Sequence, residues 1–343
     1  MKLFELSDLD RGPGRSLLQA TTAMGFSEAV SRIGLETELR AWLKPGAISA
    51  VEGELPSDLR RSRYPQKVLI IAARTLPAST MRATLMARLL GAKVILKPAS
   101  GQAAIAHAIA AADPEVSVRP FSSGDLTELD AAIAEVDALV VLGSDETIKE
   151  IKSRTPDTKA FVAYGHRVSA AWLDSDADAA LLALARDLCA WDQAGCLSPQ
   201  VVWVSSSPEA MLPKLAEALR RVEAELPMAL SHDALVARQP ALTYAEMMGK
   251  ALSTESALLC ALKSPEFRPS PGYRCLWVLP ASEAHLQTIE PYLSTLGISG
   301  RLTIPLADHV RRCPIGEMQR PPLTWAHDGL PNLSPMLLPQ RRH

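Results

Sequence analysis

The sequence lacks long apolar runs and a strong net charge, and each absence excludes a class of protein. No apolar stretch approaches the roughly 18 residues that would suggest a membrane span. The N-terminal segment MKLFELSDLDRGPG carries acidic residues where a signal peptide needs an apolar core. Because the formal net charge is -2, no basic surface for nucleic acid is expected. We therefore expect a cytoplasmic protein whose partner is a small molecule.

Cysteine is scarce and irregularly placed. The chain has five cysteines among 343 residues, with neither a CxxC pair nor the spacing of a zinc site. Reduced thiols are expected rather than a disulfide framework, and no metal site is predicted. Apolar residues make up 48% of the chain and charged residues 22%, which is typical of a globular protein with enough material for two packed domains.

Short β-branched runs alternate with helical patterns from Gln66 onward, as in KVLIIAA, KVILKP, ALVVLG and KAFVAYG. This alternation indicates βαβ units on a parallel sheet. We predict an α/β fold with a doubly wound parallel-sheet cofactor domain and a second α/β catalytic domain. The predicted segments are an N-terminal arm over 1–65, a nucleotide-binding domain over 66–188, a catalytic domain over 189–310, and a C-terminal segment over 311–343 that packs back over the cofactor site.

The parallel sheet lacks the G-x-G-x-x-G sequence of dinucleotide-binding proteins, so two other strand ends become candidates for cofactor binding. Lys97 ends the strand in VILKPAS and can bind ribose or phosphate. Gly143 and Ser144 follow the strand in VVLGSDETI and can approach a pyrophosphate. The plainer alternatives are a surface lysine and an ordinary helix N-cap. Asp145 and Glu146 favour the cap, because they would repel a phosphate.

One cysteine, Cys196, lies between a helix and a strand in DLCAWDQAGCLSPQVVWV, a junction where a rigid frame can expose a reactive atom. The order of VILKPAS, LGSDETI and then this cysteine resembles the landmarks of the aldehyde dehydrogenase superfamily. Together with AYGHRVSAAWLDSDAD and CPIGEMQRPPLTWAHDG, the segment around Cys196 resembles the LuxC-type acyl-CoA reductase family, which reduces activated fatty acyl groups to aldehydes with NADPH. The likeness covers roughly residues 66–335, in a chain shorter than that family leads us to expect.

The resemblance implies that Cys196 is the nucleophile that a thioester acylates, and a thiolate is well suited to that exchange. The substrate it implies is an acyl-CoA or an acyl group on a carrier protein. Because relatives of this architecture often pair, a homo-oligomer is one expectation. For the other cysteines we favour the role of small buried hydrophobes: Cys189, Cys260, Cys275 and Cys313.

The stretch between Asp157 and Asp174 contains no carboxylate. Aldehyde dehydrogenases that release acids place a glutamate in the corresponding region, where it activates water. Without such a base, an acyl-cysteine survives long enough to accept a hydride or exchange with a thiol. The sequence therefore favours a thioester reductase over a hydrolytic aldehyde dehydrogenase. His166, in AFVAYGHRVSA, is either the proton donor or a structural histidine at a strand end.

The resemblance also indicates the cofactor and two further site residues. NAD-preferring relatives commonly have a glutamate three residues after the strand-end lysine, where this chain has Ser100; NADPH is therefore expected, with Lys97 able to pair with its 2′-phosphate. Glu317 matches the glutamate that binds the nicotinamide ribose, unless it is a solvated surface carboxylate. Thr75 stands nearest to the place of an asparagine that stabilises the oxyanion. This departure leaves open a degenerate relative that binds acyl thioesters without turnover.

Overall fold

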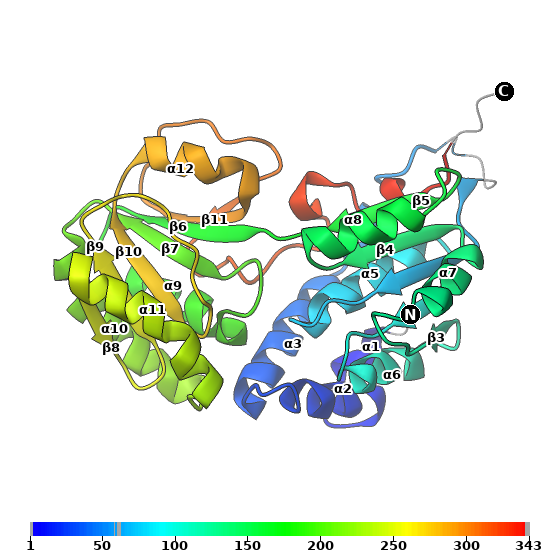
Figure 1. Ribbon diagram of the computed structural model, residues 1–343, viewed down its shortest axis with the longest axis horizontal. Helices are drawn as coiled ribbons and strands as arrows, with labels where there is room; N and C mark the ends of the chain where they lie inside the picture. Colours follow the sequence, from blue (N-terminus) through cyan, green and yellow to red (C-terminus); the bar gives the residue numbers. More distant parts are fainter. Residues whose placement is uncertain (1–2, 58, 60–62, 340–343) are drawn as a thin grey trace. The chain divides into compact units, whose positions relative to one another are not determined.

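The structure, a computed structural model, describes residues 3–57, 59 and 63–339. The chain divides into two compact units (Figure 1). Unit 1 contains the chain up to Gly25, then Leu35–His166, and the chain from Pro322 onward. Unit 2 contains Phe26–Gly34 and Arg167–Pro321. Each unit is built on a largely parallel sheet covered by helices, so the predicted α/β fold is confirmed.

Unit 1 has a five-stranded parallel sheet in the order β3-β2-β1-β4-β5. The strands are β1 (Lys67–Ile71), β2 (Lys93–Lys97), β3 (Val116–Val118), β4 (Ala138–Leu142) and β5 (Ala160–Tyr164). The linking helices are α5 (Pro77–Leu89), α6 (Ala103–Ala111), α7 (Leu126–Ala134) and α8 (Asp145–Arg154). The central strands are buried almost throughout, because helices cover both faces of a parallel sheet.

The strand order of unit 1 reverses between β1 and β4. The chain leaves β1 toward β2 on one side and leaves β4 toward β5 on the other. In open α/β sheets, ligands bind beyond the carboxyl ends of the strands at such a point of reversal. The loops after β1, β2 and β4 are therefore the place to look for a cofactor site in this unit.

The N-terminal arm, in which the sequence favours one amphipathic stretch, FSEAVSRIGLETELRAWL, is helical over most of its length. Its helices are α1 (Leu3–Ser7), α2 (Gly12–Thr22), α3 (Glu28–Trp42) and α4 (Ala47–Glu52). Pro13 lies in the first turn of α2, where a missing N–H breaks no hydrogen bond, so it begins the helix instead of interrupting it. Leu6 and Leu17 are fully buried, which shows that these helices pack as part of a core.

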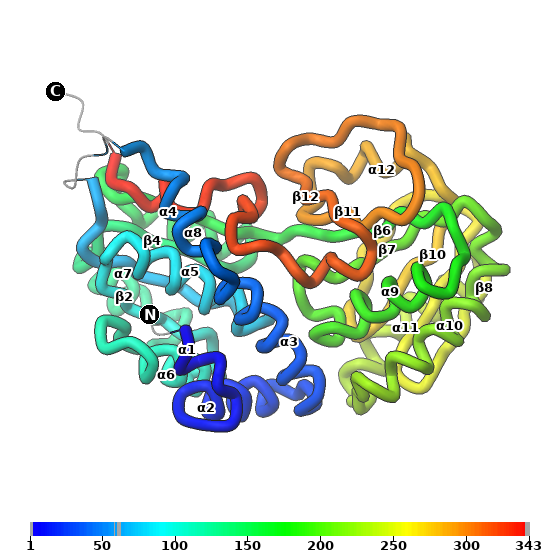
Figure 2. The backbone as a smooth tube through the Cα atoms, turned by 180° about the vertical axis from the view of Figure 1, so that it is seen from behind, coloured from blue at the N-terminus to red at the C-terminus, as the bar shows by residue number. Residues whose placement is uncertain are grey.

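The chain from Pro322 onward is anchored within unit 1. Arg82 of α5 donates hydrogen bonds to the carbonyl oxygens of Leu323 and Trp325, each at 2.7 Å, and to Asn332 Oδ1 at 2.6 Å. Asn332 also donates to the Glu54 carboxylate, close to the end of α4, and Figure 2 shows this red segment running beside α4. The chain from Pro322 onward is therefore held by α5 and by Glu54 within unit 1, and whether it covers a cofactor stays a prediction.

Unit 2 has a seven-stranded sheet in the order β12-β11-β6-β7-β10-β9-β8, in which only the β8–β9 pairing is antiparallel. The strands are β6 (Val168–Leu173), β7 (Pro199–Val204), β8 (Gly249–Ser253), β9 (Leu258–Leu262), β10 (Cys275–Pro280), β11 (Leu293–Ser299) and β12 (Arg311–Pro314). The helices are α9 (Asp178–Cys189), α10 (Pro208–Glu225), α11 (His232–Met248) and α12 (Glu283–Ile289).

The boundaries between the two units differ from those predicted at residues 188 and 310. β6 lies before residue 188 and α9 begins before it, yet both belong to unit 2, because β6 pairs with β7 and β11 and α9 packs on α10. β12 pairs with β11, which brings residues 311–321 into unit 2 as well. The chain passes from β5 to β6 through residues 165–167 alone. No linker composition marks such a boundary, because it is set by pairing between strands distant in sequence.

Within the ranges that the structure describes, no helix combines the length and the apolar character needed to cross a membrane.

Candidate active site

Cys196 lies in unit 2, in the loop between a short 3-10 helix, Ala190–Gln193, and β7. It is partly exposed, as an accessible nucleophile must be. Its carbonyl oxygen accepts a hydrogen bond from Ser169 Oγ at 2.6 Å. Ser169 Oγ in turn accepts a hydrogen bond from the Thr295 amide at 3.2 Å. The backbone at Cys196 is therefore tied to β6 and β11.

The other cysteines are poorly suited to nucleophilic chemistry. Burial raises the pKa of Cys189 to about 12 and that of Cys313 to about 11, so both thiols stay protonated at neutral pH. A hydrogen bond to Cys275, together with burial, raises the pKa of Cys260 as well. Cys189, Cys260 and Cys275 are buried, as predicted, whereas Cys313 is only partly buried.

The three residues before the Cys196 loop have left-handed backbone conformations. The φ angles of Trp191, Asp192 and Gln193 are 52°, 49° and 64°. This conformation costs a residue with a side chain roughly 1–2 kcal/mol, and it persists only where the surrounding structure enforces it. The contacts of these three side chains therefore show what fixes the approach to Cys196.

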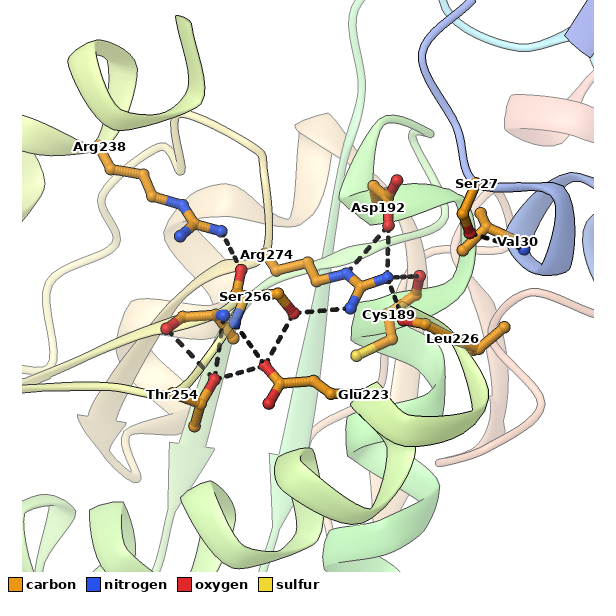
Figure 3. A network of polar contacts seen from close by, with 11 residues as sticks. Ser27, Val30, Cys189, Asp192, Glu223, Leu226, Arg238, Thr254, Ser256 and Arg274 are labelled. Atoms are coloured by element: carbon orange, nitrogen blue, oxygen red, sulfur yellow. Dashed lines mark hydrogen bonds and ion pairs between the residues drawn. The ribbon is translucent and has the colours of Figure 1, made fainter. Parts of the chain in front are cut away.

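Asp192 is held by a buried ion pair with Arg274 (Figure 3). Arg274 donates to Asp192 Oδ1 from Nε at 3.0 Å and from Nη2 at 2.5 Å, and its side chain is fully buried. Burial raises the pKa of Asp192, although the Arg274 guanidinium opposes the rise. Arg274 also donates to the carbonyl oxygen of Leu226 at 2.8 Å and to Ser256 Oγ at 2.8 Å. The pair thus joins the turn to distant parts of unit 2.

The same network continues to Glu223 on α10 (Figure 3). Glu223 Oε1 accepts from the Ser256 amide at 3.0 Å, from Ser256 Oγ at 2.8 Å and from Thr254 Oγ1 at 2.5 Å. Arg238 donates to the Ser256 carbonyl oxygen. This buried cluster therefore contains two acidic and two basic side chains, whose charges offset one another.

Gln193 fixes both ends of the Cys196 loop. Its Nε2 donates to the carbonyl oxygens of Pro199 and Cys275, each at 2.8 Å, and its Oε1 accepts from the Cys275 amide at 2.7 Å. Since Gln193 and Pro199 flank the loop, one carboxamide joins its two ends to the start of β10. The loop that carries Cys196 is consequently short, closed and anchored.

Glu317, also in unit 2, follows β12 and is exposed. Its carboxylate pairs with Arg320 at 3.2 Å, and its carbonyl oxygen accepts from Arg311 at 3.3 Å. An exposed carboxylate on an anchored backbone fits both predicted alternatives, a ribose ligand and a surface group.

In unit 1, Lys97 ends β2 and is 8% exposed, so the alternative of a surface lysine is wrong. Burial lowers its pKa, and its Nζ lies 5.4 Å from the centre of the Phe121 ring. Ser100 is exposed in the turn that follows. A desolvated cation followed three residues later by an accessible hydroxyl is a suitable combination for binding an anionic group of a nucleotide.

The loop after β4 is a helix cap. Ser144 Oγ accepts from the Thr147 amide at 3.3 Å, as the capping alternative predicts. Hydrogen bonds from its own amide and from Ser144 lower the pKa of Glu146, which keeps a negative charge at the start of α8. A pyrophosphate at Gly143 would face this charge and that of Asp145. The residues after β4 thus fit a dinucleotide less well than those after β2.

Thr75 and His166 are both exposed in unit 1. Thr75 lies in the loop after β1, and Gln102 donates to the neighbouring Arg74 carbonyl oxygen, which joins this loop to the one after β2. The His166 amide donates to Asp145 Oδ1 at 3.4 Å. The exposed ring of His166 packs into no core, so its role as a proton donor stays a prediction.

The candidate residues fall into two groups. Unit 2 holds Cys196 and Glu317, and unit 1 holds Thr75, Lys97, Ser100, Gly143, Ser144 and His166. Sequence patterns missed the groups that support the Cys196 loop, above all Arg274 and Gln193. The only local sign of this support is the pair Asp192 and Gln193 in the segment WDQ. Residue propensities do not distinguish such a pair from the polar residues of an ordinary turn.

Comparisons with known proteins concern the family and the fold of the chain. A family profile described as acyl-CoA reductase (LuxC) matches residues 60–338. The fold is similar to that of an NAD-dependent benzaldehyde dehydrogenase from Corynebacterium glutamicum, with a TM-score of 0.64 and 15% identity over 87% of this chain and 75% of that one. It is also similar to an NADP-dependent glyceraldehyde-3-phosphate dehydrogenase from Bacillus halodurans C-125 complexed with NADP, with a TM-score of 0.64 and 15% identity over 90% of this chain and 76% of that one.

An NADP-dependent enzyme of E. coli has a similar fold too, with a TM-score of 0.65 and 14% identity over 87% of this chain and 72% of that one. At such identities the likeness concerns the fold alone. No curated protein matches the chain.

Proposed function

The chain belongs to the LuxC acyl-CoA reductase family, and on this basis we propose that it reduces an acyl thioester to an aldehyde through an acyl-Cys196 intermediate, with NADPH as the reductant. The family and the fold establish the broader class, an oxidoreductase that acts on aldehydes or acyl groups. The observation that carries the proposal is a partly exposed thiol on a loop whose two ends are anchored by one buried carboxamide.

Acyl transfer requires the Cys196 thiolate to attack the carbonyl carbon of the thioester. The new carbon–sulfur bond forms as the bond to the leaving thiol breaks, so coenzyme A or a carrier thiolate departs and takes up a proton. Addition of a hydride to the same carbon then breaks the bond to Cys196. The products are an aldehyde and the regenerated thiolate.

The absence of a carboxylate over residues 158–173 supports reduction over hydrolysis. Without a base that activates water, the acyl-enzyme should persist until it is reduced. In this proposal His166 protonates the leaving group or the forming aldehyde. Thr75 supplies a hydroxyl to the oxyanion in place of the asparagine of the superfamily.

Lys97 and Ser100 are proposed to hold the 2′-phosphate of NADPH, which supplies the hydride when it is bound. A buried cation keeps its attraction for an anion better than a fully solvated one. Gly143 and Ser144 are the weaker candidates, near the pyrophosphate, because the charges of Asp145 and Glu146 oppose an anion there. Glu317 is proposed as the ligand of the nicotinamide ribose. The donor thiol, coenzyme A or a carrier protein, is open within this proposal.

Incubation with a series of acyl-CoAs, followed by intact mass measurement, tests the proposal. Acylated protein should accumulate when the thioester is supplied alone and should discharge as aldehyde once NADPH is added. Cys196→Ala should abolish both the adduct and the aldehyde, whereas Cys189→Ala should leave the adduct.

Two other results would replace the proposal. Rapid release of free acid by the unmodified protein would identify a hydrolytic aldehyde dehydrogenase. NADPH binding without any turnover of acyl thioesters would identify a non-catalytic relative, the alternative that Thr75 favours.

A further inference from the structure

Two loops of unit 2 carry residues to which the proposed function assigns roles: the Cys196 loop, residues 194–198, and the Glu317 loop, residues 315–320. Each loop also carries a buried polar side chain that the proposed chemistry does not use. Ser198 is 1% exposed and Gln319 is 8% exposed. Behind both lies Asp187 of α9, which is 2% exposed.

The carboxylate of Asp187 holds the backbone of the Glu317 loop. Its Oδ2 accepts a hydrogen bond from the Gly316 amide at 2.5 Å. Gly316 has a φ of 93°, which glycine adopts without steric cost. The shape of the Glu317 loop is therefore built around Asp187.

The side chain of Gln319 connects this loop to the Cys196 loop. Its Nε2 donates to the carbonyl oxygen of Asp187 at 3.2 Å and to Ser198 Oγ at 3.0 Å. Both hydrogens of the carboxamide are thereby used. Because all three groups are buried, water cannot easily replace either bond.

We infer that Gln319, together with Asp187 and Ser198, is a positioning residue that holds the Glu317 loop in register with the Cys196 loop. The inference rests on the proposed function. Formation of the acyl-enzyme does not use the ribose contact assigned to Glu317, whereas its discharge by NADPH does. We call the hydrogen bonds of the Gln319 carboxamide to Asp187 and Ser198 the bridge. A misplacement of a reacting group by about 1 Å can slow a reaction about 100-fold. Loss of the bridge should therefore slow discharge more than acylation.

Gln319→Leu removes the carboxamide while keeping a side chain of similar size. The Cys196 adduct should form at nearly the rate of the unmodified protein, and its discharge by NADPH should slow about tenfold or more. Ser198→Ala leaves the bond to Asp187 and should have a smaller effect. The double variant should be no slower than Gln319→Leu alone, because both changes remove the same bond.

Gln239→Leu, on the exposed part of α11, is the matched control and should change neither step. Equal slowing of acylation and discharge in Gln319→Leu, or no slowing of either, would overturn the inference. An unmodified protein that forms no adduct would instead contradict the proposed function, and the bridge then has a separate test.

That test is hydrogen exchange without any substrate. Ser198→Ala, in the Cys196 loop, should speed amide exchange in residues 315–320, and Gln319→Leu should speed it in residues 194–198. Faster exchange in each loop upon substitution of the other loop would support the bridge, whatever reaction the protein catalyses. Exchange that changes only within the substituted loop would show that the two loops are independent and would refute the inference.

Discussion

Ser100 carries an exposed hydroxyl three residues beyond Lys97, the buried residue that ends β2. Ser100→Glu should weaken NADPH binding on the order of tenfold through repulsion of the 2′-phosphate, while NADH binding should change little. Fluorescence titration of both cofactors measures the difference. Ser153→Glu, on the exposed surface of α8, adds the same charge to unit 1 and serves as the control.

Equal affinity of the unmodified protein for NADPH and NADH would contradict this assignment. The sequence could point to Ser100 because its identification depends only on its place three residues after the lysine that ends a strand. It could not show that Lys97 is desolvated, since its burial depends on what packs around the end of β2. At Ser144 the local pattern was sufficient, because a helix cap is formed by residues adjacent in the chain.

The turn before the Cys196 loop has three consecutive residues in the left-handed region, and the Asp192–Arg274 ion pair helps to hold this turn. Arg274→Met leaves a buried carboxylate without its counter-ion, a change that costs about 3–5 kcal/mol. We expect the free energy of unfolding to fall by this amount and acylation of Cys196 to slow as the turn relaxes. Denaturant titration and adduct formation measure the two effects.

Two further variants separate the ion pair from the turn. Arg220→Met, in an exposed pair on α10, should cost no more than about 1 kcal/mol. Asp192→Leu combined with Arg274→Met removes both buried charges and should regain part of the stability. If acylation also returned to its original rate in this double variant, the ion pair would not be what holds the loop.

The stability of the whole protein should depend on pH through Asp187. Burial raises its pKa to about 7 from 3.8, although hydrogen bonds from the Glu317 loop oppose the rise. Between these values the folded chain binds the proton more tightly than the unfolded chain. The resulting stabilisation is complete below the lower value and is lost as the pH rises through the higher one, with a slope approaching about 1.4 kcal/mol per pH unit.

Asp187→Asn removes this titration and keeps one acceptor oxygen for the loop amides. Denaturant titrations from about pH 5 to about pH 8 should show that the unmodified protein loses stability relative to the variant across this range. A constant difference between the two proteins would mean that Asp187 does not titrate there.

The sequence by itself determined the α/β class, the succession of strands and helices from β1 to β5, and the position of Cys196 at a helix–strand junction. These features depend on periodicity and on residues close together in the chain, which local patterns report directly. The resemblance of three segments, in order, identified the family for the same reason: each motif is continuous in the sequence.

Only the tertiary structure decided where the units divide and what holds the Cys196 loop. The division at residues 166–167 follows from the pairing of β6 with β7 and β11. The loop is held by Arg274, and Gln319 reaches it from more than 100 residues away in the chain. Left-handed residues, buried ion pairs and bridging carboxamides are stable only when such distant partners meet, because the cost of strain and desolvation is offset by contacts that no local segment contains.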